Sequence, residues 1–156
     1  MHTYSVRSWD NAIREYYLFP EHRYFVTIVD DTNKNRIPDF GHSLDSEHWI
    51  KLVLDGHDTF EIKAELKRLL EWHKNVPDGE HIVIHCSYGM TRSPSMALSM
   101  MIADGLNGKE ALDKLYSQEP LPECSDSEFE LSPRIIEVID HYMRLRGNLI
   151  EPFYER

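Results

Sequence analysis

Short apolar runs rich in β-branched residues alternate along the chain with longer segments of helical periodicity. The runs at 24–29, 49–54 and 81–85 predict buried strands, and a shorter run at 5–7 predicts an edge strand. Helical spacing of apolar residues, or an apolar stretch that begins with proline, predicts helices. These helices are expected at 10–17, 59–75, 93–104, 109–117 and 133–147. Asp10 is the predicted cap of the first helix.

Strands that alternate with helices predict the fold class α/β, with a central and mostly parallel sheet flanked by helices. A length of 156 residues suits a single domain over 1–156, and we expect a loose tail from about residue 147. The stretch 31–47 is rich in turn residues, whereas 118–131 is acidic and holds two prolines. Both stretches are predicted to be surface loops.

The composition is typical of a globular protein, with 41% hydrophobic and 28% charged residues. No apolar run approaches the roughly 20 residues that a membrane span needs, and the first residues lack the features of a secretory signal. A net charge of −10 disfavours nucleic acids and anionic membranes as partners. These features do not predict an oligomeric state.

The most informative stretch is H-C-S-Y-G-M-T-R-S at 85–93, which joins a predicted strand to a predicted helix. The loop must curl, and Gly89 can take the positive φ that this requires. A curled loop that enters a helix N-terminus points several backbone N–H groups at one spot, which favours an anion. Arg92 adds a planar fork that suits two phosphate oxygens, and the same field favours the thiolate of Cys86. A thiolate beneath a bound phosphate is placed to attack phosphorus.

The pattern H-C-x-x-G-x-x-R-S resembles the phosphate-binding loop of the cysteine-dependent protein tyrosine phosphatases, and most of all the compact dual-specificity group. The resemblance covers roughly residues 24–145, and it is sharp at 85–93 and weaker at 55–59. It implies a protein tyrosine phosphatase-like fold and a phosphocysteine intermediate. Cys86 is the implied nucleophile, and Arg92 with the loop N–H groups is implied to hold the phosphate oxygens.

The resemblance also implies roles for the other residues of the loop. His85 orients the loop through hydrogen bonds, and Ser93 offers a hydroxyl to the sulfur that assists breakdown of the phosphoenzyme. The residues implied to bind the substrate are Ser87, Tyr88, Gly89, Met90 and Thr91. Simple packing is the alternative role for Tyr88 and Met90.

Two carboxylates compete for the role of general acid. The resemblance favours Asp58, because the acid of dual-specificity phosphatases is usually an Asp followed by Thr before the helix that leads to the signature strand. Asp55 is the alternative. Asp58 also resembles the N-cap of a capping box with Glu61, a structural role that would restrict its movement.

Two departures from the family pattern affect the hypothesis. The loop contains no Lys, which lowers the expectation of a phosphoinositide substrate. The region 121–127 contains no Asn to support the catalytic loop, so Ser125 or Asp126 is expected to serve in its place.

The nine histidines raise the question of a metal. His81 and His85 share a strand face, but there is no H-x-x-x-H on a helix and no cysteine pair to support a site. The chemistry implied for Cys86 needs no metal, so we expect neither a catalytic metal nor another cofactor.

The sequence therefore predicts a phosphatase for phosphotyrosine in a protein or peptide, with phosphoserine and phosphothreonine as further candidates. One alternative keeps the mechanism on a small phosphate ester, a nucleotide or an inositol phosphate. The other is a phosphopeptide-binding pseudo-phosphatase. A reactive thiolate at Cys86 needs reducing conditions, which predicts the cytoplasm and sensitivity to mild oxidants. Cys124 is the other cysteine, either as a disulfide partner or as an unrelated loop residue.

Overall fold

The computed structural model describes residues 1–19, 23–40, 44–55, 57–87, 91–118 and 129–156. Strands and helices alternate through the first two thirds of the chain, and helices follow. The elements are β1 (Thr3–Arg7), α1 (Trp9–Leu18), β2 (Arg23–Val29), the 3-10 helix η1 (Asp31–Asn33), β3 (Trp49–Val53), α2 (Thr59–Lys74), β4 (His81–Cys86), α3 (Arg92–Ala103), α4 (Gly108–Ser117), α5 (Pro133–Tyr142) and α6 (Ile150–Tyr154).

The strands form one sheet in the order β1-β4-β2-β3, and every neighbouring pair is parallel. The predicted α/β class is confirmed, and the sheet is wholly rather than mostly parallel. β4 lies inside the sheet, with Ile82 opposite Tyr4 of β1 on one side and Tyr24 of β2 on the other. The strand that ends at Cys86 is therefore held from both sides.

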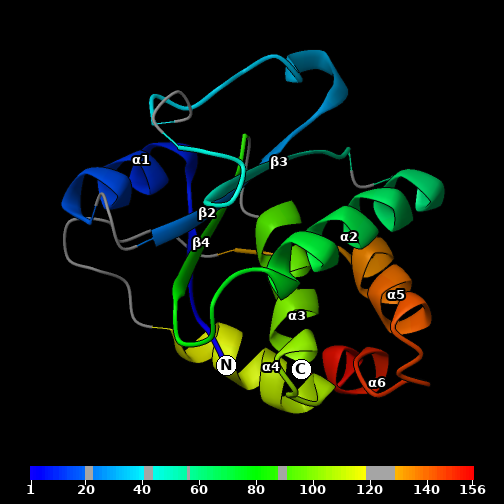
Figure 1. Ribbon diagram of the computed structural model, residues 1–156. Helices are drawn as coiled ribbons and strands as arrows, with labels where there is room; N and C mark the ends of the chain where they lie inside the picture. Colours follow the sequence, from blue (N-terminus) through cyan, green and yellow to red (C-terminus); the bar gives the residue numbers. More distant parts are fainter. Residues whose placement is uncertain (20–22, 41–43, 56, 88–90, 119–128) are drawn as a thin grey trace.

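One face of the sheet packs against several helices, and the other face packs against α1 (Figure 1). Val26, Ile28, Ile82 and Ile84 belong to a large core with α2, α3 and α5. Their neighbours Phe25 and Val83 point the other way, into a smaller core with Ala12 of α1 and with Phe40. This alternation follows from the two-residue period of a strand. It places Cys86 on the face of the large core and His85 on the face of α1.

The helix boundaries differ from the expectations at two places. Ser8, rather than Asp10, caps α1, because its side chain accepts a hydrogen bond from the backbone N–H of Asn11. The last long helix ends at Tyr142, well before Gly147. Arg146 and Gly147 beyond it have positive φ values, which a continuing helix does not allow.

The end of the chain packs against the domain, although a loose tail was expected there. The carboxylate of Asp140 accepts hydrogen bonds from the backbone N–H groups of Gly147, Leu149 and Ile150. Leu149 is fully buried, and α6 packs against α4 and α5. Because Asp140 satisfies the N–H groups that lead into α6, the tail is fixed to α5.

Helix side chains bind backbone groups of both outer strands of the sheet. At β1, the N–H of Val6 donates a 3.0 Å hydrogen bond to Oε1 of Gln118, directly after α4. At β3, the N–H of Val53 donates a 2.8 Å bond to Oε2 of Glu65, and Arg68 donates to the carbonyl oxygen of Lys51. Among the described helices, none is both long enough and apolar enough to cross a membrane.

Candidate active site

Cys86 lies at the carboxyl end of β4, where parallel α/β sheets place their ligands. The β2–β4 ladder continues one residue past it, because the N–H of Ser87 donates a 2.9 Å bond to the carbonyl oxygen of Ile28. The Cys86 side chain is buried, and its Sγ lies 3.4 Å from Oγ of Ser93 in the first turn of α3. The structure therefore brings together the sulfur and the hydroxyl that the sequence paired.

Arg92 begins α3 and is buried beside the same strand end. Its Nη1 donates a 2.7 Å bond to the carbonyl oxygen of Leu54, and its Nη2 donates a 3.2 Å bond to Oγ of Ser87. These contacts with described residues engage two of the five N–H groups of a guanidinium. They fix the plane of the fork between the ends of β3 and β4.

The N-terminus of α3 differs from those of the other long helices. Side chains at the N-cap accept hydrogen bonds from the first turn of α1, α2, α4 and α5. At α3 the N-cap is Thr91, whose side chain makes no such bond. The first N–H groups of a helix need an acceptor, and a bound anion can supply it.

The first turn of α3 is hydrogen-bonded to the residue that precedes α5. Oγ of Ser95 donates a 2.6 Å bond to the carbonyl oxygen of Thr91 and accepts a 2.8 Å bond from the N–H of Ser132. The start of α5 is thereby joined to the residue that precedes Arg92. The sequence analysis expected support for the loop from the region 121–127. The support seen among the described residues comes instead from Ser95 and Ser132.

His85 is buried in a small polar network on the α1 face of the sheet. Its Nε2 lies 2.7 Å from Oγ1 of Thr27, which also accepts a 2.9 Å bond from the indole N–H of Trp49. Because the indole can only donate, the Thr27 hydroxyl proton is free to point at Nε2. Burial and the charge of Arg36 lower the pKa of His85 to about 3. The ring is therefore neutral at working pH. The hydrogen bond of Nε2 goes to β2, so the role of His85 in orienting the loop stays a prediction.

The two candidate acids follow Leu54, whose carbonyl oxygen contacts Arg92. Asp58 is the N-cap of α2, and its Oδ1 accepts bonds from the N–H groups of Phe60 at 2.8 Å and Glu61 at 3.3 Å. The predicted capping box is only half formed, because Glu61 accepts a 2.7 Å bond from the N–H of Asp55 instead of that of Asp58.

Asp55 is held differently from Asp58. Its Oδ1 accepts a 3.1 Å bond from the N–H of Asp31, and the side chain is exposed. One carboxylate therefore orders the loop after β2, while the other orders the start of α2. Both aspartates belong to the segment that begins at Leu54, to which Arg92 donates a hydrogen bond.

Comparisons with known proteins add a structural likeness. No protein-family model matches the sequence, and no curated protein matches it. The chain is similar to a solved structure described as "Crystal Structure of PTPMT1", with 14% sequence identity and a TM-score of 0.49. The match covers 90% of this chain and 89% of that chain.

The structure adds neighbours of the site that the sequence analysis missed. Asp30 follows β2, where a hydrogen bond from Thr32, backbone N–H groups and the charge of Arg92 lower the pKa of its carboxyl group. Its position was a usable signal, because the carboxyl ends of adjacent parallel strands meet at one edge of a sheet. Thr27 gave a second signal, since it is a hydroxyl within an apolar strand.

Several predicted residues lie outside the described part of the chain. These are Tyr88, Gly89 and Met90 in the loop, and Cys124, Ser125 and Asp126 in the acidic segment. Their predicted roles remain predictions. Within the described part, Cys86, Ser87, Thr91, Arg92 and Ser93 lie together where β4 leads into α3.

Proposed function

We propose that this protein is a cysteine-dependent phosphatase that hydrolyses phosphotyrosine in a protein or peptide through a phosphocysteine intermediate. One observation carries the proposal. The buried Cys86 sulfur lies 3.4 Å from the Ser93 hydroxyl, at the N-terminus of a helix whose N-cap side chain makes no capping bond. Nucleophile, anion-binding N–H groups and an arginine fork then share one place.

The proposed reaction has two steps, which form and then hydrolyse a phosphocysteine. The Cys86 thiolate attacks phosphorus, the S–P bond forms, and the P–O bond to the leaving group breaks as Asp58 gives its proton to the leaving oxygen. The Asp58 carboxylate then takes a proton from water, whose oxygen attacks phosphorus. The S–P bond breaks, and inorganic phosphate leaves the regenerated thiolate.

The surrounding groups stabilise charge in both steps. Arg92 and the N–H groups at the start of α3 suit the three equatorial oxygens of the transferring phosphoryl group. The Ser93 hydroxyl can donate to the sulfur, which supports the thiolate as the leaving group of the second step. The bond between Arg92 and Leu54 holds the fork in place before the substrate arrives.

The preference for phosphotyrosine rests on the general acid. A tyrosine oxygen with a pKa near 10 leaves more easily than the alkoxide of serine or threonine, so it needs less help from an acid. Asp58 accepts two backbone hydrogen bonds as the cap of α2, which restricts its movement toward a leaving oxygen. An enzyme with such an acid favours substrates with a good leaving group.

A substrate panel tests this proposal. Turnover of an aryl phosphate is measured in the presence of a chelator, followed by peptides of one sequence that carry phosphotyrosine, phosphoserine or phosphothreonine. We expect kcat/KM for the phosphotyrosine peptide to exceed the others by at least about tenfold. Acid quench and mass spectrometry should find one phosphoryl group on the peptide that contains Cys86.

The same panel separates the alternatives. Faster turnover of nucleotides or inositol phosphates than of any phosphopeptide would reassign the substrate class and keep the mechanism. Tight phosphopeptide binding without turnover would indicate a pseudo-phosphatase. Cys124→Ser is the matched control, and it should keep the activity of the wild type.

A further inference from the structure

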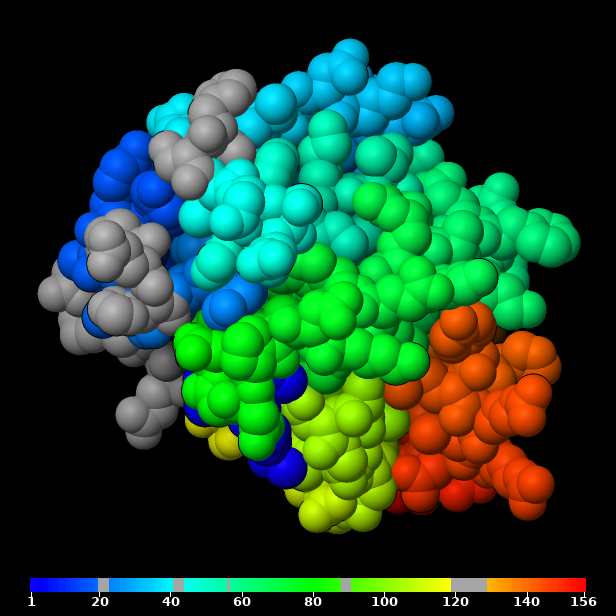
Figure 2. All heavy atoms as spheres, viewed as in Figure 1, coloured from blue at the N-terminus to red at the C-terminus, as the bar shows by residue number. Residues whose placement is uncertain are grey.

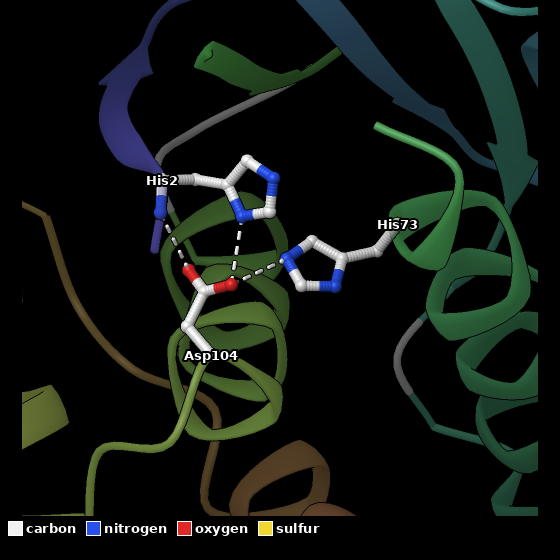
Figure 3. Close-up of side chains that lie close together, drawn as sticks. All are labelled: His2, His73 and Asp104. Carbon is white, nitrogen blue, oxygen red and sulfur yellow. Dashed lines mark hydrogen bonds and ion pairs between the residues drawn. The ribbon is translucent and has the colours of Figure 1, made fainter. Parts of the chain in front are cut away.

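A second polar cluster lies at the other end of the sheet from Cys86. It joins His2 before β1, His73 in the last turn of α2 and Asp104 at the C-cap of α3 (Figure 3). Oδ1 of Asp104 lies 2.7 Å from Nδ1 of His2 and 3.2 Å from Nε2 of His73. All three side chains are at least nine-tenths buried.

We propose that His2, His73 and Asp104 form a binding site for a divalent transition metal ion, with zinc as the best fit. Their ligand atoms all lie within 4.8 Å of one another. A tetrahedral zinc ion with bonds of about 2.0–2.1 Å places its ligand atoms about 3.3 Å apart. The His73–Asp104 distance of 3.2 Å is already close to this spacing, and the 2.7 Å His2–Asp104 distance reaches it by opening about 0.6 Å.

The hydrogen bonds around the cluster orient its members as metal ligands. Nε2 of His2 lies 3.0 Å from the carbonyl oxygen of Val76, which can only accept, so this nitrogen carries a proton. The metal-binding lone pair then falls on Nδ1, the atom that faces Asp104. A ligating histidine usually donates its other N–H to a carbonyl or carboxylate in this way.

The metal would replace hydrogen bonds that the three residues and Tyr4 now make. Nδ1 of His2 faces Oδ1 of Asp104, and Nε2 of His73 lies 3.0 Å from the hydroxyl of Tyr4 as well as 3.2 Å from Oδ1. A zinc ion bound by these three ligand atoms takes the place of the hydrogen between Nδ1 of His2 and Oδ1. Tyr4 donates a 2.6 Å bond to Oδ2 of Asp104, which leaves Oδ1 for the metal.

The electrostatic setting favours a cation. His73 lies in the last turn of α2, and Asp104 directly follows α3, so two helix C-termini converge on the cluster. The unpaired carbonyl groups of a helix C-terminus carry partial negative charge. Two imidazoles and one carboxylate suit zinc, whereas magnesium and calcium prefer sites made of oxygen atoms.

A metal ion has a route to the cluster from solvent. A surface hollow of about 570 Å³ is lined by His2, His73 and residues 75–78, among others. Figure 2 shows atoms of the amino-terminal segment at the surface, between the green atoms that follow α2 and the yellow-green atoms of α3 and α4. Water in this hollow can supply the fourth ligand.

The proposed role of the metal is to attach the amino end of the chain to two helices. Five residue steps of β4, about 16 Å, separate the level of His81 from that of Cys86. The site is therefore too far from the sulfur to take part in the reaction. The metal would instead hold the C-terminal end of α3, and Arg92 lies at the N-terminal end of the same helix.

Metal titration tests the proposal in the Cys86→Ser parent, because that variant lacks the thiolate that would bind zinc at the catalytic loop. Isothermal titration with Zn²⁺ should give one site per chain with a Kd below about 10 µM. His73→Gln, Asp104→Asn and His2→Gln should each weaken this site at least about 100-fold, and Tyr4→Phe about 10–100-fold. His141→Gln, which changes an exposed histidine of α5, should leave it unchanged.

A second measurement covers ligand variants that fail to fold. Nitrogen-15 spectra of the histidine side chains in the parent should show Zn²⁺ shifting Nδ1 of His2 and Nε2 of His73. Co²⁺ should give the intense visible bands of tetrahedral coordination. The proposal is overturned if the parent binds no Zn²⁺ below about 100 µM, if those nitrogens do not shift, or if folded ligand variants bind as the parent does. Equal affinity for Mg²⁺ would also overturn it.

Discussion

The guanidinium of Arg92 donates a 2.7 Å hydrogen bond to the backbone carbonyl oxygen of Leu54. This bond joins the start of α3 to the segment that carries both candidate acids, Asp55 and Asp58. Because the acceptor is a backbone oxygen, any residue at position 54 can supply it, and Arg92 is the partner whose side chain the bond requires. The position of the arginine fork and the position of the acid segment are thereby coupled.

Arg92→Lys tests the importance of the fork. Lysine keeps the charge but cannot bond to Leu54, Ser87 and a phosphate oxygen with one planar group. We expect kcat to fall about 10²–10³-fold, with weaker binding of phosphate as well. Steady-state kinetics with an aryl phosphate measure both effects. Arg68→Lys on the exposed side of α2 is the control, and a rate for Arg92→Lys within a few-fold of wild type would remove Arg92 from the transition state.

Cys86→Ser tests the nucleophile. Serine keeps the size of the side chain near Ser93 but replaces the thiolate with a poor nucleophile. Turnover should fall by more than about 10⁴-fold, while phosphopeptide affinity stays close to wild type. Fluorescence anisotropy with a labelled phosphopeptide measures the affinity. Substantial residual activity in the purified variant would contradict the assignment.

Asp58 can be tested with two substitutions that separate its roles. Asparagine is as good an N-cap as aspartate but cannot donate a proton as an acid, whereas alanine loses both functions. Both variants should lose about 10²–10⁴ in kcat for a poor leaving group, and less for an activated one. Only Asp58→Ala should also lose about 1 kcal/mol of unfolding free energy.

The pH profile of these variants identifies the acid. The basic limb of the kcat profile reports loss of the acid's proton, so it should disappear in Asp58→Asn. Asp55→Asn is the comparison variant. If it loses the basic limb and the leaving-group dependence while Asp58→Asn keeps both, then Asp55 is the acid and Asp58 only caps α2.

The lowered pKa of His81 makes the free energy of unfolding depend on pH. Burial, followed by the charges of Arg23 and Arg7, lowers its pKa in the folded chain to about 3, against about 6.5 when unfolded. Between these values the unfolded chain binds a proton that the native chain does not, so stability falls as pH decreases. From pH 6.5 to pH 5 this one group should cost the native state about 1–2 kcal/mol.

Urea unfolding at several pH values measures this loss. His81→Asn should lose less stability than wild type between pH 7 and pH 5, because its side chain does not titrate. His85 acts in the same direction and remains in both proteins, so the difference between the two curves isolates His81. Parallel curves for wild type and His81→Asn would rule the prediction out.

The sequence predicts the elements better than their arrangement. The apolar runs locate β2, β3 and β4 to within about one residue, because buried strands of a parallel sheet leave a continuous signal. The pairing of Thr3 with His81 has no such signal, since it joins residues that are far apart in the chain. The bonds of Asp140 that fix the tail are equally hidden, because a lone Asp in a helix has many possible roles.

In the candidate site, too, the sequence predicts the residues that lie close together in the chain and misses those that lie far apart. The motif around Cys86 identifies the side chains that are adjacent in sequence, whereas Leu54 contributes only a backbone oxygen that no sequence pattern reveals. His2, His73 and Asp104 are separated by 71 and 31 positions, which matches no metal-binding motif. The one available signal was His73 itself, a polar residue on the apolar face of a predicted helix.

The bonds that Gln118, Glu65 and Arg68 make to the outer strands have a consequence for how copies of this chain meet. A parallel sheet with exposed edges can add a strand from another molecule, and this is a common start of aggregation. At Val6, Lys51 and Val53 the backbone groups that would recruit such a strand already bind helix side chains. Residues of α2 and of the segment after α4 therefore occupy part of each edge of the sheet, where a strand from another molecule would have to pair.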